Sequence, residues 1–97
     1  MKKTLDGEKK RYRHAAHVSW RRVDAEVVIL NVDTSEYYSL DEVAAEIWDR
    51  LGRGKSLAAT VSEVAVLYGE RSERVEKDAR AFISDLLAER LLEAVSR

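Results

Sequence analysis

The first half of the folded chain alternates apolar and polar residues, as strands do. Alternation over Val18–Arg22 predicts a strand with one buried face. Glu26–Val32 is β-branched and apolar on both faces, which is typical of the central strand of a sheet. Glu36–Ser39 predicts a short third strand, and Asp24-Ala25 and Asp33–Ser35 supply the turns. Because these connections are short, we expect an antiparallel meander.

From Leu40 onward apolar residues recur at helical spacing. A capping box is expected at the start of the first helix, with Ser39 accepting from the first amides and Glu42 reaching back to the Ser39 amide. Gly52 is the expected left-handed cap at its end. The apolar stripe of this helix comprises Leu40, Val43, Ala44, Ile47, Trp48 and Leu51.

Two further helices follow. Ser56 is the expected cap of a helix over Leu57–Tyr68, and Thr60 is a competing start for it. Ser72 is the expected cap of the longest helix, over Glu73–Glu89. The apolar face of that helix comprises Val75, Ala79, Phe82, Ile83 and Leu86, with Leu87 beside it.

Composition favours a single helix-rich globular domain. The chain has 97 residues, of which 45% are hydrophobic and 36% charged. No apolar run approaches the roughly 20 residues that span a membrane. The N-terminus lacks the apolar segment of a signal peptide, so a cytoplasmic location is expected. The chain contains no cysteine, which excludes disulfides and thiolate metal sites.

Positive charge is concentrated at the N-terminus. Residues 1–22 contain eight Lys or Arg and two acidic residues, although the net charge of the chain is −1. Residues 1–16 show no sustained periodicity, so we expect a flexible basic arm there and the folded domain over residues 17–97. Such an arm can contact nucleic acid or an acidic partner, but more often it is only a solvated terminus.

The residues favour binding over catalysis. His14 and His17 are the only histidines, and a surface or packing role is expected for both because further metal ligands are missing nearby. No phosphate loop or nucleophile motif is present. We therefore expect no enzyme activity and no cofactor. The carboxylates of the first helix are expected on its solvated face: Asp41, Glu42, Glu46 and Asp49.

Two features indicate where binding would occur. Glu36–Ser39 is the last strand of the meander, so one edge of it can lie open and accept another chain as an added strand. The apolar stripe of the third helix is wide, and Val75, Phe82 or Leu86 can floor a groove beside that strand if it lies at the margin. The alternative is that all of these residues belong to the core.

Several short motifs follow one another in a fixed order over residues 18–93. They are carried by Val28, Leu30, Tyr38, Leu40, Ala44, Ile47, Trp48, Gly54–Leu57, Tyr68, Gly69, Val75, Asp78, Phe82, Ile83 and Leu86. Each motif is weak alone, but their order and spacing resemble those of the PqqD-like proteins.

The resemblance implies a small α+β, winged-helix-like domain, with a three-stranded antiparallel sheet followed by three α-helices. It also implies a peptide chaperone. Such a protein binds the leader of a ribosomally made precursor peptide and presents its core to a modifying enzyme, such as a radical enzyme, a protease or a cyclase. The leader adds as a strand to the third strand and packs against the third helix. Carried over, the peptide-binding residues are Tyr37, Tyr38, Ser39, Val75, Asp78, Ala79, Phe82, Ile83 and Leu86.

Two positions depart from the family pattern. Many relatives have Leu-Asn where this chain has Leu40-Asp41, and the charge of Asp41 suits the first helical turn. Relatives often end the third helix with Gly-Leu, whereas here Arg90 precedes Leu91. Because arginine is strained in the left-handed conformation, we expect the helix to run on by a turn. Leu91-Leu92 should then fold back onto the core as an extended tail.

Two other functions stay open at this point. A winged-helix DNA-binding protein would share the architecture and use the basic arm, although its recognition helix would carry few exposed Lys or Arg and nucleic acid is therefore an unlikely partner. A scaffold domain would use the same open edge to pair with a second copy as a homodimer.

Overall fold

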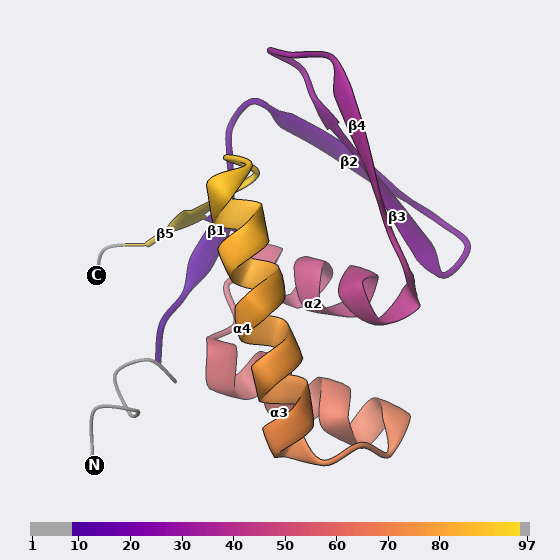
Figure 1. The fold of residues 1–97 in the computed structure, drawn as a ribbon, viewed down its shortest axis with the longest axis vertical. Coiled ribbons are helices and arrows are strands. Elements are labelled where there is room, and N and C mark those ends of the chain that lie inside the picture. Colours follow the sequence, from indigo (N-terminus) through magenta and orange to yellow (C-terminus); the bar gives the residue numbers. More distant parts are fainter. Residues whose placement is uncertain (1–8, 96–97) are drawn as a thin grey trace.

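A computed structural model of the chain describes residues 9–95. They form two antiparallel sheets and three helices (Figure 1). The elements are β1 (Tyr12–His14), β2 (Val18–Val23), β3 (Glu26–Asn31), β4 (Glu36–Leu40), α2 (Glu42–Gly52), α3 (Leu57–Tyr68), α4 (Ser72–Ala88) and β5 (Leu92–Ala94). The predicted α+β fold, a three-stranded meander followed by three helices, is confirmed. Among these residues no helix is long and apolar enough to cross a membrane.

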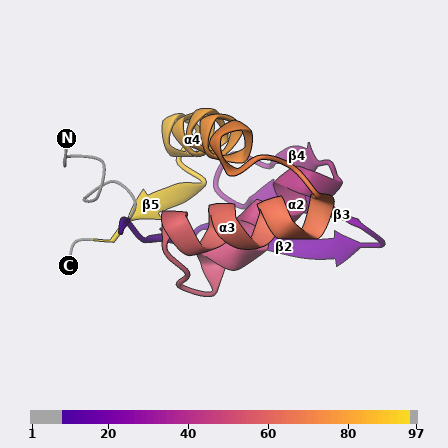
Figure 2. The same ribbon diagram turned by 90° about the horizontal axis from the view of Figure 1, so that it is seen from below.

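The larger sheet has the order β2-β3-β4 and is covered on one face. On β3, Val27 and Ile29 are fully buried, whereas Val28 and Leu30 between them are half-exposed. The helices lie on the side of Val27 and Ile29, and α4 crosses the layer formed by α2 and α3 (Figure 2). The central position predicted for β3 is confirmed, but its second face is not covered by the described elements.

The start of α2 differs from the predicted capping box. Ser39 lies in β4, and Asp41 is the cap, accepting a hydrogen bond from the Ala44 amide at 3.0 Å. The strand continues because Leu40 is buried and pairs with Val27. Aspartate and asparagine cap helices equally well, so the departure from the family pattern at this position preserves the fold.

The prediction that residues 1–16 form a flexible arm is wrong for residues 9–16, which the structure describes. β1 pairs with β5, and Tyr12 and Ala15 are buried. A three-residue strand is too short to show a period of two, which is why the sequence pattern missed it. Residues 1–8 lie outside the described residues.

His14 packs on the core rather than on the surface. Its ring stacks on the Trp48 indole with centroids 3.7 Å apart, and its Nε2 donates to the Trp48 carbonyl oxygen at 2.9 Å. Burial lowers the pKa of His14, and the hydrogen bond to the Trp48 backbone opposes that shift. The packing role expected of this histidine is therefore the one observed.

Gly52 is the last residue of α2 and not its left-handed cap. Gly54 takes the left-handed conformation instead, with φ of 88°. A Cβ on Gly52 would lie 2.2 Å from Cε1 of His14. Glycine is therefore required at this position by the close approach of the histidine ring.

The second helix agrees with its prediction, and the third differs at its start. Ser56 caps α3, accepting from the Ala59 amide at 3.1 Å, and Thr60 is buried within α3 rather than capping it. Ser72 is the first residue of α4, and Arg71 precedes it without a side-chain cap.

The end of α4 contradicts the expectation that the helix runs on. It ends at Ala88, and Arg90 adopts the left-handed conformation with φ of 63°. The Leu91 amide donates to the Leu86 carbonyl at 2.9 Å, as in a Schellman motif. Burial of Leu91 and Leu92 contributes about 1.5–3 kcal/mol each, more than the roughly 1–2 kcal/mol of left-handed strain. The expected extended tail is confirmed as β5.

Gly52→Ala should destabilise the protein, although alanine usually stabilises a helix relative to glycine by about 0.5–1 kcal/mol. The added methyl collides with the His14 ring, which cannot move because it is stacked on Trp48. We expect a loss of about 1–3 kcal/mol of unfolding free energy in urea titrations. In a His14→Ala background the same change should be neutral or stabilising. An equal loss in both backgrounds would contradict this account.

Candidate peptide-binding site

The last strand of the meander is an edge strand. β4 pairs with β3 through Tyr37↔Leu30, Tyr38↔Ile29 and Ser39↔Val28, and no other described strand pairs with it. β2 is the opposite edge of the same sheet. At the edge of β4 a side chain is hydrogen-bonded to Glu89, the residue that follows α4.

Tyr38 makes that contact. It is half-buried against the core, and its hydroxyl lies 3.0 Å from Glu36 Oε1 and 3.1 Å from Glu89 Oε1. Glu89 directly follows α4, so Tyr38 links the strand to the C-terminal end of this helix. Partial burial and the hydrogen bonds to the two carboxylates raise the pKa of Tyr38 to about 12.

The three predicted strand residues do not share a face. Successive side chains of a strand point to opposite sides, and Tyr38 points toward the core. Tyr37 is 70% exposed on the other face of the sheet, and Ser39 is exposed beside it. The backbone of all three lies at the edge, but only Tyr38 presents its side chain toward α4.

The six predicted helix residues divide into core and accessible positions. Phe82 is half-buried at the margin of the core and Asp78 is exposed. Helical spacing places both on the flank of α4 that leads to Glu89, and therefore on the side of β4. The other four are buried in the core: Val75, Ala79, Ile83 and Leu86.

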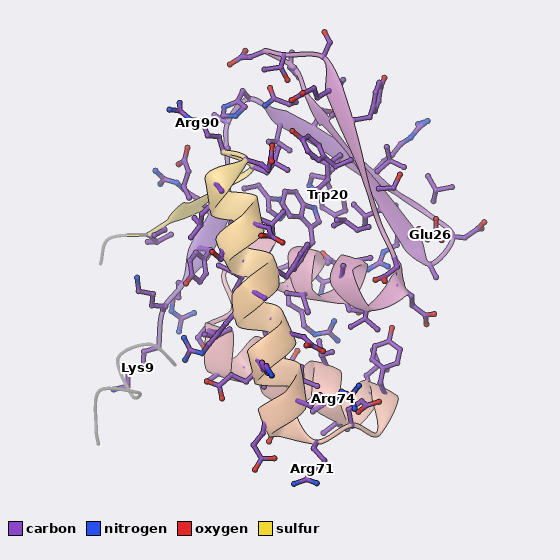
Figure 3. All side chains as sticks on the ribbon, viewed as in Figure 1. Lys9, Trp20, Glu26, Arg71, Arg74 and Arg90 are labelled. Carbon is purple, nitrogen blue, oxygen red and sulfur yellow. The ribbon has the colours of Figure 1, made fainter. Side chains whose placement is uncertain are left out.

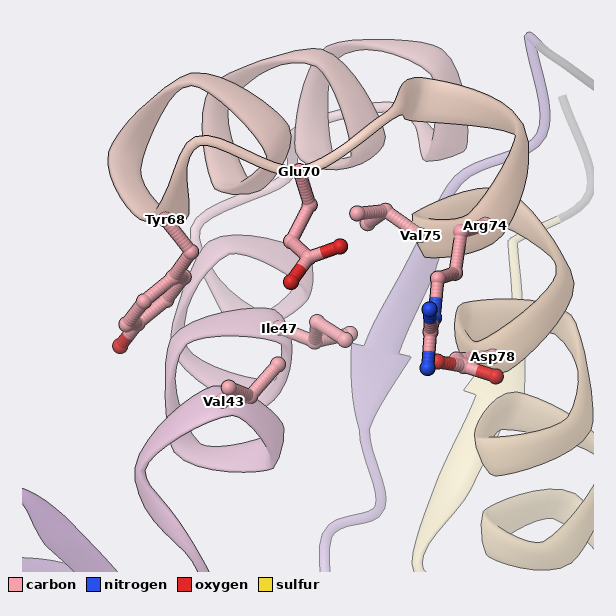
Figure 4. Close-up of a pocket in the computed structure, with 7 residues that line it drawn as sticks. All are labelled: Val43, Ile47, Tyr68, Glu70, Arg74, Val75 and Asp78. Carbon is pink, nitrogen blue, oxygen red and sulfur yellow. The ribbon is translucent and has the colours of Figure 1, made fainter.

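A pocket of about 320 Å³ opens between α2 and α4, beyond the point where β4 passes into α2 (Figure 4). Apolar side chains from both helices form its floor, and charged side chains surround its mouth. The lining residues are Val43, Ile47, Tyr68, Glu70, Arg74, Val75 and Asp78. Two of them, Val75 and Asp78, belong to the predicted peptide-binding residues. Val43 belongs to the predicted apolar stripe of the first helix, but it is 41% exposed.

The carboxylates of α2 are not all solvated as expected. Asp49 lies 3.3 Å from the Arg22 guanidinium of β2, and Glu46 lies 3.6 Å from it. Arg50 bridges Glu46 and Glu63, which connects α2 to α3. These ion pairs help hold the sheet on the helices, on the side away from the edge of β4.

The two histidines do not form a ligand set. His14 is engaged with Trp48, and His17 Nε2 lies 2.8 Å from the Arg90 carbonyl oxygen. Within residues 9–95 no three His, Cys, Asp or Glu side chains lie together in a way that would hold a metal ion.

A small meander with a free strand edge, bordered by the third of three helices, is a winged-helix-like arrangement. The sequence profile of the family described as "Coenzyme PQQ synthesis protein D (PqqD)" matches residues 26–92. The chain belongs to this family, and the resemblance inferred from its motifs is confirmed.

Two solved structures are similar over nearly their whole length. The structure described as "TbiB1 in Complex with the TbiA(beta) Leader Peptide" is 32% identical, with a TM-score of 0.81, covering 88% of this chain and 99% of that one. "Lasso peptide synthetase B1 complexed with the leader peptide" is 26% identical, with a TM-score of 0.77, covering 89% of this chain and 99% of that one. Among curated protein sequences none matches.

Tyr38 should stay protonated to unusually high pH. Its ring carbon signals, followed by NMR, should remain those of the neutral phenol well above pH 10 and change near pH 12. Glu89→Gln removes a negative acceptor that disfavours the phenolate, so the transition should move to lower pH. Tyr37→Phe is the matched control and should leave the Tyr38 titration unchanged. A Tyr38 transition near pH 10 in the unaltered protein would show that the link to Glu89 does not form.

Proposed function

We propose that this protein binds the leader of a ribosomally made precursor peptide as an added strand on β4. It then presents the core of that precursor to a modifying enzyme, such as a radical enzyme, a protease or a cyclase. The observation that carries the proposal is the free edge of β4 beside α4, in a PqqD-family chain whose two similar structures are leader-peptide complexes.

The edge of β4 provides affinity that depends little on the leader sequence. Backbone hydrogen bonds to an added strand contribute about 0.5–1.5 kcal/mol each. Alternate side chains of that strand would face α4, where Tyr38, Phe82 and Asp78 are the accessible groups of the predicted set. The remaining side chains would point to the opposite face, beside Tyr37 and Ser39.

The pocket between α2 and α4 provides selectivity. Its floor of Val43, Ile47 and Val75 suits one large apolar side chain of the leader, whose burial contributes about 1.5–3 kcal/mol. Ordering a disordered leader costs about 2–5 kcal/mol, so the net affinity falls in the micromolar to nanomolar range.

The domain contributes no chemistry of its own in this proposal. It acts by tethering the core peptide near the enzyme, in the cytoplasm where the precursor is made. A DNA-binding role is less favoured because α4 carries four carboxylates and three basic residues, a poor surface for phosphates.

Phe82→Ala should weaken leader binding at least about tenfold, because it removes the accessible aromatic contact of α4. The probe is a synthetic peptide spanning the leader of a candidate precursor, chosen from short reading frames beside the gene of this chain, and the measurement is titration calorimetry. The matched control is Val66→Ala, at a side chain that is 81% exposed on α3, and it should bind as the unaltered protein does.

Proline variants test strand addition itself. Alternate residues of an edge strand direct their amides at the neighbouring strand or at the open edge. Tyr37→Pro and Tyr38→Pro each remove one backbone amide of β4. In one of the two variants the lost amide is the one directed at the open edge. That variant should keep its circular dichroism spectrum and lose leader binding. Unchanged affinity in Phe82→Ala and in the folded proline variant would place the site elsewhere.

A further inference from the structure

The face of the sheet turned away from the helices carries several large apolar side chains, and no described element covers it. The register places Ser19, Leu30 and Tyr37 side by side in one row across β2, β3 and β4. Arg21, Val28 and Ser39 lie in the next row, and Val23 pairs with Glu26 in the third. We refer to these eight residues as the outer sheet face. In Figure 3 the sheet stands to the right of the helices, and the side chain of Glu26 extends away from them.

Large apolar side chains of the outer sheet face are exposed to solvent. Tyr37 is 70% exposed and Val23 is 48% exposed. A shallow hollow of about 430 Å³ lies over Val28 and Leu30. Contiguous apolar surface of this kind typically marks an interaction site.

Two charged side chains lie on this face: Arg21 on the edge strand β2 and Glu26 at the start of β3. Arg21 is the one nearer to the apolar side chains of Val28 and Leu30. Arg21 is exposed and forms no ion pair with Glu26 or with any other described residue, whereas Arg22 points to the other side and pairs with Asp49. The Arg21 guanidinium beside Val28 and Leu30 is therefore free to pair with a carboxylate that lies within an apolar patch of a partner.

The leader would extend this face. This step of the inference rests on the proposed function. Strand addition to β4 would place half of the leader side chains beside Tyr37 and Ser39, where they continue the outer sheet face. A protein docked there would contact the domain and the leader at once. The other half of the leader, against α4, would be hidden from it.

We propose that the modifying enzyme docks on the outer sheet face, through an apolar patch that carries a carboxylate opposite Arg21. The enzyme would then read a composite surface of domain and bound leader. This arrangement allows the enzyme to distinguish the domain with bound leader from the free domain. It does so without competing with the leader for the site between β4 and α4.

The test uses Leu30→Glu and Arg21→Glu, with Val66→Glu as the matched control on the exposed face of α3. Each variant is co-expressed with the candidate precursor peptide and a candidate modifying enzyme from the same gene neighbourhood. The modified fraction of the precursor is measured by mass spectrometry. Leader affinity is measured separately by calorimetry. Leu30→Glu and Arg21→Glu should bind the leader within about twofold of the unaltered protein. Both should lower the modified fraction at least about tenfold, with Val66→Glu unchanged.

The outcomes separate this inference from the proposed function. An unaltered protein that does not bind the leader overturns both. Normal leader binding with undiminished modification in both variants overturns only the proposal that the enzyme docks on this face. If Leu30→Glu does not fold, Arg21→Glu alone decides the test, because it changes an exposed strand residue. A loss of leader affinity in the folded variants would also overturn it, by assigning the face to the leader. An unaltered protein that sediments as a dimer, and an Arg21→Glu variant that sediments as a monomer, would assign the face to a second copy instead.

Discussion

The packing of Trp48 is the interaction on which the arrangement of sheet and helices depends. Its indole is fully buried, stacks on His14 of β1 and meets the edge of Trp20 of β2 at a centroid distance of 6.1 Å. Its indole N–H has no protein acceptor among the described residues. Truncation of such a fully buried tryptophan typically costs about 3–5 kcal/mol, which measures how much this packing contributes.

This packing fixes the position of the free edge of β4. Trp20 and Trp48 fix the sheet against α2, and the ion pairs of Arg22 hold it at a second point. At the other side of the sheet, β4 leads directly into α2 and contacts α4 through Tyr38 and Glu89. The strand edge is therefore held in place before any peptide arrives, which lowers the free energy that binding must supply for ordering.

Elements with strong periodicity could be predicted from sequence, and elements fixed by tertiary contacts could not. α3 and its Ser56 cap follow from local chemistry alone. β1 has three residues, and only its pairing with β5 defines it. The extended tail at Leu91-Leu92 could be predicted, but its pairing with β1 could not. The left-handed strain at Arg90 is offset by the burial of Leu91 and Leu92 in the core, and local residue propensities do not reveal that burial. At the site, the open edge could be predicted, but the spacing of α4 could not separate accessible Phe82 from its buried neighbours.

The central claim is that a leader peptide adds to β4, and amide hydrogen exchange tests it most directly. Exchange rates are measured with and without the leader peptide across the described strands. Alternate amides of Glu36–Leu40 should slow at least about tenfold when the leader binds, whereas those of β2, at the opposite edge of the sheet, should not change. Protection at β2, or bound leader without protection in β4, would contradict the account.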